Sequence, residues 1–247
     1  MSSIFSFTCA LIMGGTVGAE LPPDPPPQME ALVTAGQVTI EYVSDPEFVE
    51  LDRGNCEFQL EFARTFQYRF QTIRRSRKPL VRITMTSIDP TVTVSHAIRM
   101  PAPYARPKPW ESRLLRHEFD HVAVGCDPRA KLLLKYLVRQ LPPIEHPLQV
   151  GETADAVLCE KLINLELDRR EDAVTEVIRR SNQLLDALSR HGEINIPERA
   201  QFFAKLYTKE HLASLDFPFV AEALKVFETE AYIAAERFHL EQDPTIK

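Results

Sequence analysis

The run LLRHEFDHVAV, residues 114–124, contains His117, Glu118 and His121. On a helix, residues four apart share a face, so His117 and His121 can point their imidazoles at one ion. Imidazole nitrogens bind zinc at roughly 2.0–2.1 Å, and zinc lowers the pKa of its bound water. Glu118 would lie beside that water as a general base. The run predicts a zinc site; the alternative is an ordinary helix with three solvated polar residues.

A catalytic zinc needs a third protein ligand and one open position. His191 is the favoured candidate, because it follows Leu188 by three residues at the end of a long predicted helix. A histidine in the last turn before Gly192 equally fits a C-capping role. His191 is therefore predicted as a ligand, with capping as the alternative.

Acidic residues are the other candidates for the third ligand. Asp127 lies ten residues after His117, although it also suits the N-cap of a helix that begins at Pro128. Glu160 and Glu176 belong to the long predicted helix. A metal held close to Cys126 or Asp127 would instead indicate a structural ion with no open position.

The first 19 residues, MSSIFSFTCALIMGGTVGA, have an apolar middle, small residues at the end and no charge. They predict a cleaved secretory signal, with Glu20 as the new first residue; an uncleaved anchor is the alternative. No second apolar stretch approaches spanning length. We therefore expect an exported protein of the periplasm, cell envelope or exterior, without stable membrane insertion after cleavage. Residues 20–28 form a proline-rich spacer.

Removal of the signal leaves Cys56, Cys126 and Cys159, an odd number. One disulfide with one free thiol is compatible with export, and the sequence does not choose the pair. The absence of CxxC spacing disfavours a cysteine-based zinc site. His96 lies in a predicted strand, where a half-exposed histidine is favoured over a contact with substrate.

The chain divides into a β-rich half and a helical half. Residues 36–100 alternate apolar and polar side chains, with Asp89-Pro90 as an expected turn and 51–63 open to a helical interpretation. Helices are expected from about Pro109 to Val124, from Pro128, over 152–190 and within 197–239. The expected fold class is α+β: a small antiparallel sheet followed by a helical half that contains the H-E-x-x-H helix.

The composition excludes some classes of partner. The chain has 247 residues, 44% hydrophobic and 26% charged, which is ordinary for a globular protein, and its net charge is −6. This charge argues against a nucleic-acid partner. The basic run RRSRK, residues 74–78, is interpreted as a solvated hairpin loop. The sequence indicates no oligomeric state.

A sheet followed by an H-E-x-x-H helix resembles the zincin metallopeptidases. More narrowly, the chain is similar to a family of uncharacterised bacterial secreted proteases with predicted zinc dependence. The similarity covers roughly residues 38–192 and includes a T-aromatic-x-aromatic strand at 65–68 and Pro109-Trp110 before the helix. The family's D-x-x-T-x-H-G element corresponds to DALSRHG, residues 186–192, with serine in place of threonine.

The resemblance implies a zincin-like metallopeptidase domain over 29–192, followed by a C-terminal helical extension over 193–247. His117, His121 and His191 would hold Zn²⁺, and Glu118 would act on the water that attacks a peptide or protein substrate. Two hypotheses compete with this one. The domain could be a catalytically inactive binding or scaffold protein of the envelope, or it could hold a purely structural metal.

Overall fold

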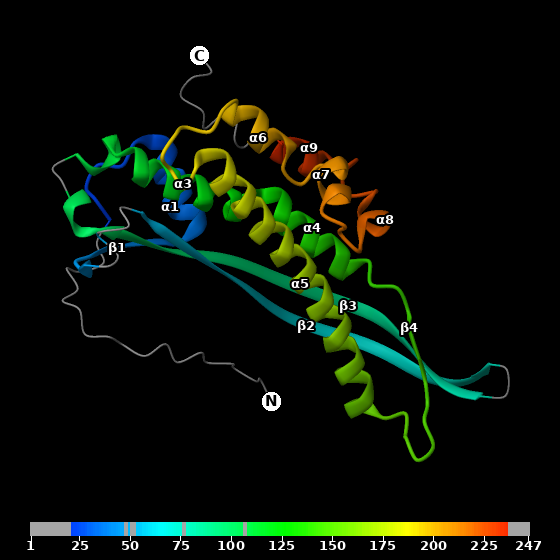
Figure 1. Cartoon of the computed structure of the whole chain (residues 1–247). Helices are drawn as coiled ribbons and strands as arrows, with labels where there is room; N and C mark the ends of the chain where they lie inside the picture. Colours follow the sequence, from blue (N-terminus) through cyan, green and yellow to red (C-terminus); the bar gives the residue numbers. More distant parts are fainter. Residues whose placement is uncertain (1–20, 47–48, 50–52, 76–77, 106–107, 237–247) are drawn as a thin grey trace.

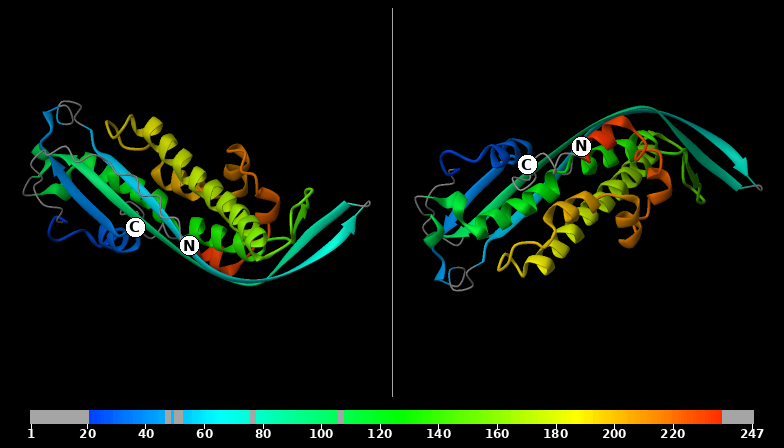
Figure 2. Two further views of the ribbon diagram at one scale, coloured as in Figure 1. Left: turned by 90° about the horizontal axis from the view of Figure 1, so that it is seen from below. Right: turned by 90° about the horizontal axis from the view of Figure 1, so that it is seen from above.

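The computed structural model describes residues 21–46, 49, 53–75, 78–105 and 108–236. The predicted signal, residues 1–19, lies outside the described residues. A sheet and a set of helices form the fold, so the expected α+β class is confirmed. Figures 1 and 2 show the helices gathered along one side of a long, twisted β-ribbon that extends past them.

The sheet has the order β1-β3-β2, and β4 pairs with the outer end of β3. Its strands are β1 (Val38–Val43), β2 (Asn55–Arg75), β3 (Lys78–Pro101) and β4 (Ile144–Pro147). β2 and β4 run antiparallel to β3, whereas β1 runs parallel to it. The expectation of a purely antiparallel sheet was therefore wrong. The chain crosses from β1 to the opposite edge to form β2, and the β2–β3 hairpin then returns β3 between them in the direction of β1.

The expected turn at Asp89-Pro90 is also absent, because β3 continues through both residues. Pro90 pairs with Arg64 of β2 at a point where β3 has no second neighbour, since β1 pairs with residues 96–101 and β4 with 80–83. A proline lacks the N–H that a second neighbouring strand would need, so it is tolerated here. The region around 51–63 is β2 from Asn55 onward rather than a helix.

Of the helices whose bounds the structure gives, α1 precedes β1 and the others follow β3. The helices are α1 (Pro27–Gly36), α3 (Arg113–Cys126), α4 (Pro128–Arg139), α5 (Ala156–Ser189), α6 (Arg199–Lys205), α7 (Lys209–Ser214), α8 (Val220–Ala223) and α9 (Glu230–Ala235). Short 3-10 segments cover Ala102–Tyr104 and Pro109–Glu111. Within the described part of the chain, no helix is both long enough and apolar enough to cross a bilayer.

α3 is the central helix, and it packs against α1, α5, β2 and β3. Its start is fixed by Ser112, whose hydroxyl accepts a hydrogen bond from the Leu115 backbone N–H at 3.3 Å. Burial extends around most of its circumference, including Leu115, Phe119 and Val122, as expected for a helix enclosed by neighbours. The H-E-x-x-H residues are therefore inside the protein.

A buried ion pair joins α4 to the C-terminal helices. Asp127 caps α4 and pairs with Arg129, and both side chains are fully buried. Arg129 also donates to the backbone oxygen of Phe203 at 2.8 Å, and the Tyr207 hydroxyl donates to the Val124 oxygen at 2.9 Å. The C-terminal helices thus pack on the same hydrophobic core and fix the end of α3.

The first helix was expected to end at about Val124, but α3 continues through Gly125 to Cys126. A Cβ on Gly125 would lie 2.4 Å from Nε2 of His96. The His96 ring is 3% exposed, so it is not the half-exposed strand residue expected from the alternation, and its Nδ1 lies 3.1 Å from the Gly36 oxygen. The missing side chain of Gly125 therefore makes the space that the His96 ring fills between β3 and α3.

Gly125→Ala should destabilise the protein by about 1–3 kcal/mol, because the added methyl overpacks the core against His96. In an unobstructed helix the same change would stabilise by about 1 kcal/mol. Urea denaturation of a double-mutant cycle with His96→Ala tests this, and the cost should disappear in the His96→Ala background. A gain in stability from Gly125→Ala alone would contradict this packing.

Candidate metal centre

Three side chains from two helices converge at the H-E-x-x-H motif. His117 and His121 of α3 meet Asp186 of α5, and their potential ligand atoms form a group that could hold a metal ion. His117 Nε2 and His121 Nε2 are 3.2 Å apart. Asp186 Oδ1 lies 3.1 Å from His121 Nε2 and 3.3 Å from His117 Nε2. The motif thus forms one side of a compact triangle, and α5 supplies the other corner.

The size of this triangle matches one face of a zinc coordination tetrahedron. Ligand atoms placed about 2.0–2.1 Å from a tetrahedral ion are roughly 3.3–3.4 Å apart. The observed separations of 3.1, 3.2 and 3.3 Å are within a few tenths of an ångström of that spacing. Two imidazole nitrogens and one carboxylate oxygen also form a typical donor set for catalytic zinc.

Asn182, one helical turn before Asp186, orients one of the imidazoles. The His121 ring nitrogen Nδ1 lies 3.1 Å from Asn182 Oδ1. When Nδ1–H donates to that amide oxygen, Nε2 keeps the lone pair that a metal requires. His117 differs, because its buried Nδ1 has no hydrogen-bond partner within the described part of the chain.

The electrostatics of the triangle favour a positive charge at its centre. Burial lowers the pKa of His121, but the hydrogen bond to Asp186 and the nearby Glu118 carboxylate outweigh it, so the pKa is raised. Burial raises the pKa of Asp186, but hydrogen bonds with His117 and His121 hold it well below its usual range. A proton or a cation shared by these groups is therefore stabilised.

Glu118 is the most deeply buried member of the motif, with 2% exposure. Burial, supplemented by the charge of Asp186 and opposed by His121, raises its pKa to about 7. Gly54, just before β2, lies directly against this carboxylate, since a Cβ there would be 2.3 Å from Glu118 Oε1. The carboxylate is thus held in a dry environment, where proton exchange near neutral pH is favoured.

The turn that ends α5 encloses the site. Arg190, His191 and Gly192 have φ angles of 51°, 55° and 81°, so the chain passes through the left-handed region at three consecutive residues. The Ser189 hydroxyl accepts a hydrogen bond from the Gly192 N–H at 3.2 Å. A Cβ on Gly192 would lie 2.9 Å from Cδ2 of His117. Glycine at this position allows both the turn and the close contact with the ligand ring.

His191 lies at the rim of the triangle. Its Nδ1 is 3.5 Å from Asp186 Oδ1, and its side chain is 53% exposed. It is not part of the group whose potential ligand atoms all lie within 4.8 Å of one another. The geometry therefore favours Asp186 over His191, the candidate taken from the sequence, as the third donor to a metal.

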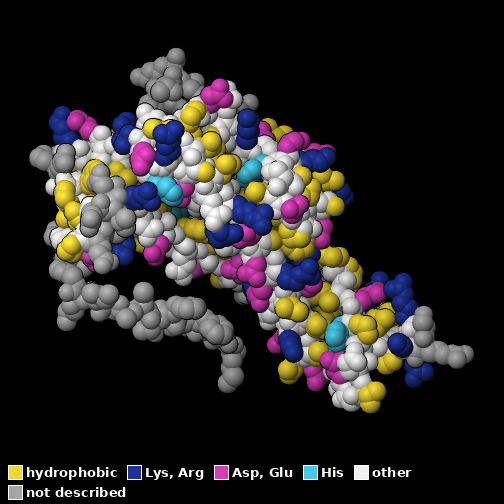
Figure 3. Space-filling view, viewed as in Figure 1, with side chains coloured by type: hydrophobic (Ala, Val, Ile, Leu, Met, Phe, Trp, Pro, Cys, Tyr) yellow, Lys and Arg dark blue, Asp and Glu magenta, His cyan; other side chains and the backbone are white. Residues whose placement is uncertain are grey.

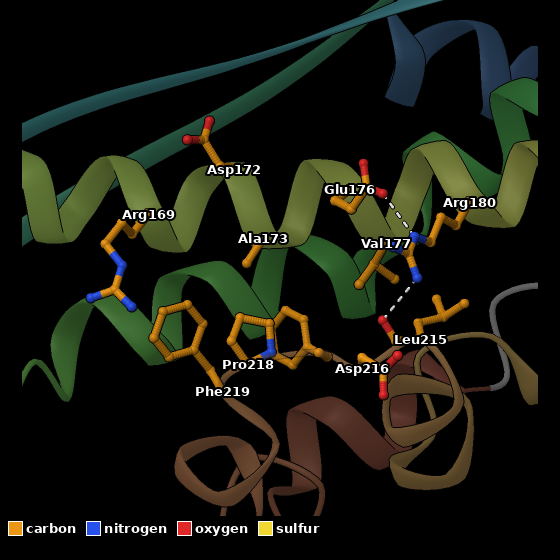
Figure 4. Close-up of a pocket in the computed structure, with 11 residues that line it drawn as sticks. Arg169, Asp172, Ala173, Glu176, Val177, Arg180, Leu215, Asp216, Pro218 and Phe219 are labelled. Carbon is orange, nitrogen blue, oxygen red and sulfur yellow. Dashed lines mark hydrogen bonds and ion pairs between the residues drawn. The ribbon is translucent and has the colours of Figure 1, made fainter.

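The other acidic candidates have different partners. Asp127 is in the buried pair with Arg129, and Glu160 accepts a hydrogen bond from the Tyr68 hydroxyl at 3.5 Å. Glu176 pairs with Arg180 at 2.7 Å beside a hollow of about 340 Å³ between α5 and residues 215–219 (Figure 4). These carboxylates are separate from the His117 and His121 rings.

The cysteines do not join the triangle. Cys56, Cys126 and Cys159 are free thiols in the structure. The Cys126 sulfur lies 3.9 Å from His96 Nδ1, on the side of α3 that faces α1 and β3. Burial raises its pKa to about 12, so this thiol remains protonated at neutral pH.

The third-ligand candidates taken from the sequence did not include Asp186, because the sequence does not show which face of α5 packs against α3. Leu184 and Leu188, although apolar, are 44% and 39% exposed. The buried face instead includes Ile178, Ser181, Leu185 and Ser189. The i, i+4 pair Asn182 and Asp186 borders this face, and that spacing of polar residues is the signal that could have identified the ligand.

Comparison with protein-family models, with curated proteins and with solved structures gives no match.

Asp186→Ala should weaken zinc binding by more than the roughly 10–100-fold expected for Asn182→Ala, because Asp186 supplies a ligand atom and Asn182 only orients one. Asp172→Ala, on the same helix but at the separate hollow, is the matched control and should bind like the wild type. Competition with a chromophoric chelator measures these affinities. The zinc affinity of His191→Ala should stay within about threefold of the wild-type value. A loss of affinity equal to that of Asp186→Ala would instead make His191 a ligand.

Proposed function

We propose that the chain is an exported zinc-dependent hydrolase, and specifically a peptidase. The observation that supports this most directly is the convergence of His117, His121 and Asp186 on one point, with Glu118 on the same turn of α3 as the two histidines. The separations of 3.1–3.3 Å suit a tetrahedral ion with one position left for water or substrate. Two imidazoles and one carboxylate bind zinc in catalytic sites and Fe(II) in others, and the H-E-x-x-H pattern is our reason for proposing zinc.

The chain's own groups have distinct roles in this proposal. Zinc, when bound, would lower the pKa of a water and polarise the scissile carbonyl. Glu118 would accept the proton of the attacking water and then deliver it to the leaving amine. Its pKa of about 7 lies close to the operating pH of such a shuttle. Asn182 would keep the His121 ring in the orientation that binding requires.

The resemblance to secreted zinc-dependent proteases is consistent with this geometry. Residues 186–192, matched to the D-x-x-T-x-H-G element, comprise the end of α5, with Asp186 in the triangle, and the turn after it, in which Gly192 lies against His117. The Ser189 hydroxyl supports the turn, and a threonine hydroxyl could do the same. We therefore include a zincin-like fold in the proposal.

The burial of Glu118 supports a second candidate function. A general base that is 2% exposed beneath Gly54 has little access to a substrate. The chain could thus be an envelope protein that binds a metal without turnover, as a scaffold or through a structural ion. Asp186 and His191 are the more open side of the site, with side chains 30% and 53% exposed.

Glu118→Gln should lower casein hydrolysis by at least about 100-fold, because it removes the proton acceptor. Zinc stoichiometry should remain at one, since Glu118 is not a triangle member. Glu160→Gln is the matched control and should keep full activity. Turnover by Glu118→Gln at the wild-type rate would contradict the assigned role, and zinc binding without turnover by the wild type would favour the second candidate.

Export can be tested separately from catalysis. Expression in a Gram-negative host should yield a periplasmic or secreted form that begins at Glu20, because Val17 and Ala19 occupy the two positions that a signal peptidase recognises. N-terminal sequencing of the fractionated protein measures this. A cytosolic protein that retains residues 1–19 would contradict export and would leave the zinc proposal intact.

A further inference from the structure

The outer end of the β2–β3 ribbon has a basic face. Arg69 and Arg75 of β2 and Lys78 and Arg82 of β3 form this face, and all four are exposed. Figure 3 shows Lys and Arg side chains gathered where the ribbon extends beyond the helices. The face lies far along β3 from the metal centre, so the proposed chemistry does not account for it.

The strand register places these cations on one side of the ribbon. Arg75 pairs directly with Lys78, and Gln71 pairs with Arg82. Directly opposed residues of an antiparallel pair share a face, and so do residues two apart along a strand. Arg69, Gln71 and Arg75 are thus aligned over roughly 20 Å, at about 3.4 Å per residue.

The local charge is opposite to that of the whole chain. Residues 69–75, 78–84 and 144–147 include a single carboxylate, Glu145. It pairs with Arg75 at 3.1 Å and with Arg82 at 3.2 Å. Arg69 and Lys78 remain in excess on the face, whereas the chain as a whole has a net charge of −6.

We propose that the basic face docks the protein onto an anionic lipid bilayer. A projecting, extended row of cations matches a planar array of phosphate headgroups, and each Lys or Arg near such a surface contributes attraction. The rest of the protein has a net negative charge and is repelled by the same surface, so contact with the bilayer is confined to the ribbon end.

The test is co-sedimentation of the full chain with vesicles of phosphatidylcholine that contain or lack 30% phosphatidylglycerol, in 0.1 M salt. A triple variant, Arg69→Gln, Arg75→Gln and Lys78→Gln, removes three charges from the face. Lys205→Gln, Lys209→Gln and Lys225→Gln remove three exposed charges from the helical body and form the matched control. All proteins keep the same N-terminal segment, so its contribution cancels.

The wild type and the control should bind the anionic vesicles at least tenfold more tightly than the neutral ones. The face variant should lose at least tenfold of its affinity for the anionic vesicles. Equal binding of the face variant and the wild type would overturn the proposal, as would no preference of the wild type for anionic lipid. Face-dependent binding to a DNA duplex without vesicle binding would also overturn it, in favour of a polyanion ligand.

Discussion

The structure depends on holding two imidazoles and one carboxylate within 3.1–3.3 Å of one another inside the protein. Burying ionisable groups costs free energy unless each has a partner. The interactions among the three side chains of the triangle offset this free-energy cost only if α3 and α5 keep a fixed separation. The α1, β2 and β3 contacts of α3 provide the fixed frame. The buried Asp127–Arg129 pair then fixes the far end of α3 against the C-terminal helices.

β3 links the two functional regions that we propose. Near its C-terminal end, His96 packs against Gly125 of α3, and its N-terminal end contributes Lys78 and Arg82 to the basic face. A continuous strand of 24 residues therefore connects the region of the candidate metal centre to the ribbon end. Docking through the basic face would place the metal centre at a distance from the bilayer, where peptides in the aqueous phase could reach it.

The α+β class, the helical placement of His117 and His121 and the long helix followed from periodicity and capping residues in the sequence. The sequence did not predict Asp186 as the third member of the triangle. Asp186 comes from α5, and only the packing of α5 on α3 decides which face of α5 is buried. The parallel β1–β3 pair and the unbroken strand through Pro90 depend on strand order, which alternation does not encode. Gly125 and Gly54 resemble ordinary breakers in sequence, yet each makes room for another residue's side chain.

Zinc K-edge X-ray absorption of the metal-loaded protein tests the donor set most directly. The account predicts four-coordinate zinc with two imidazoles, oxygen from Asp186 and water at about 2.0–2.2 Å, and one imidazole fewer in His121→Ala. Sulfur scattering at about 2.3 Å, or a shell of oxygen donors without imidazole, would contradict it.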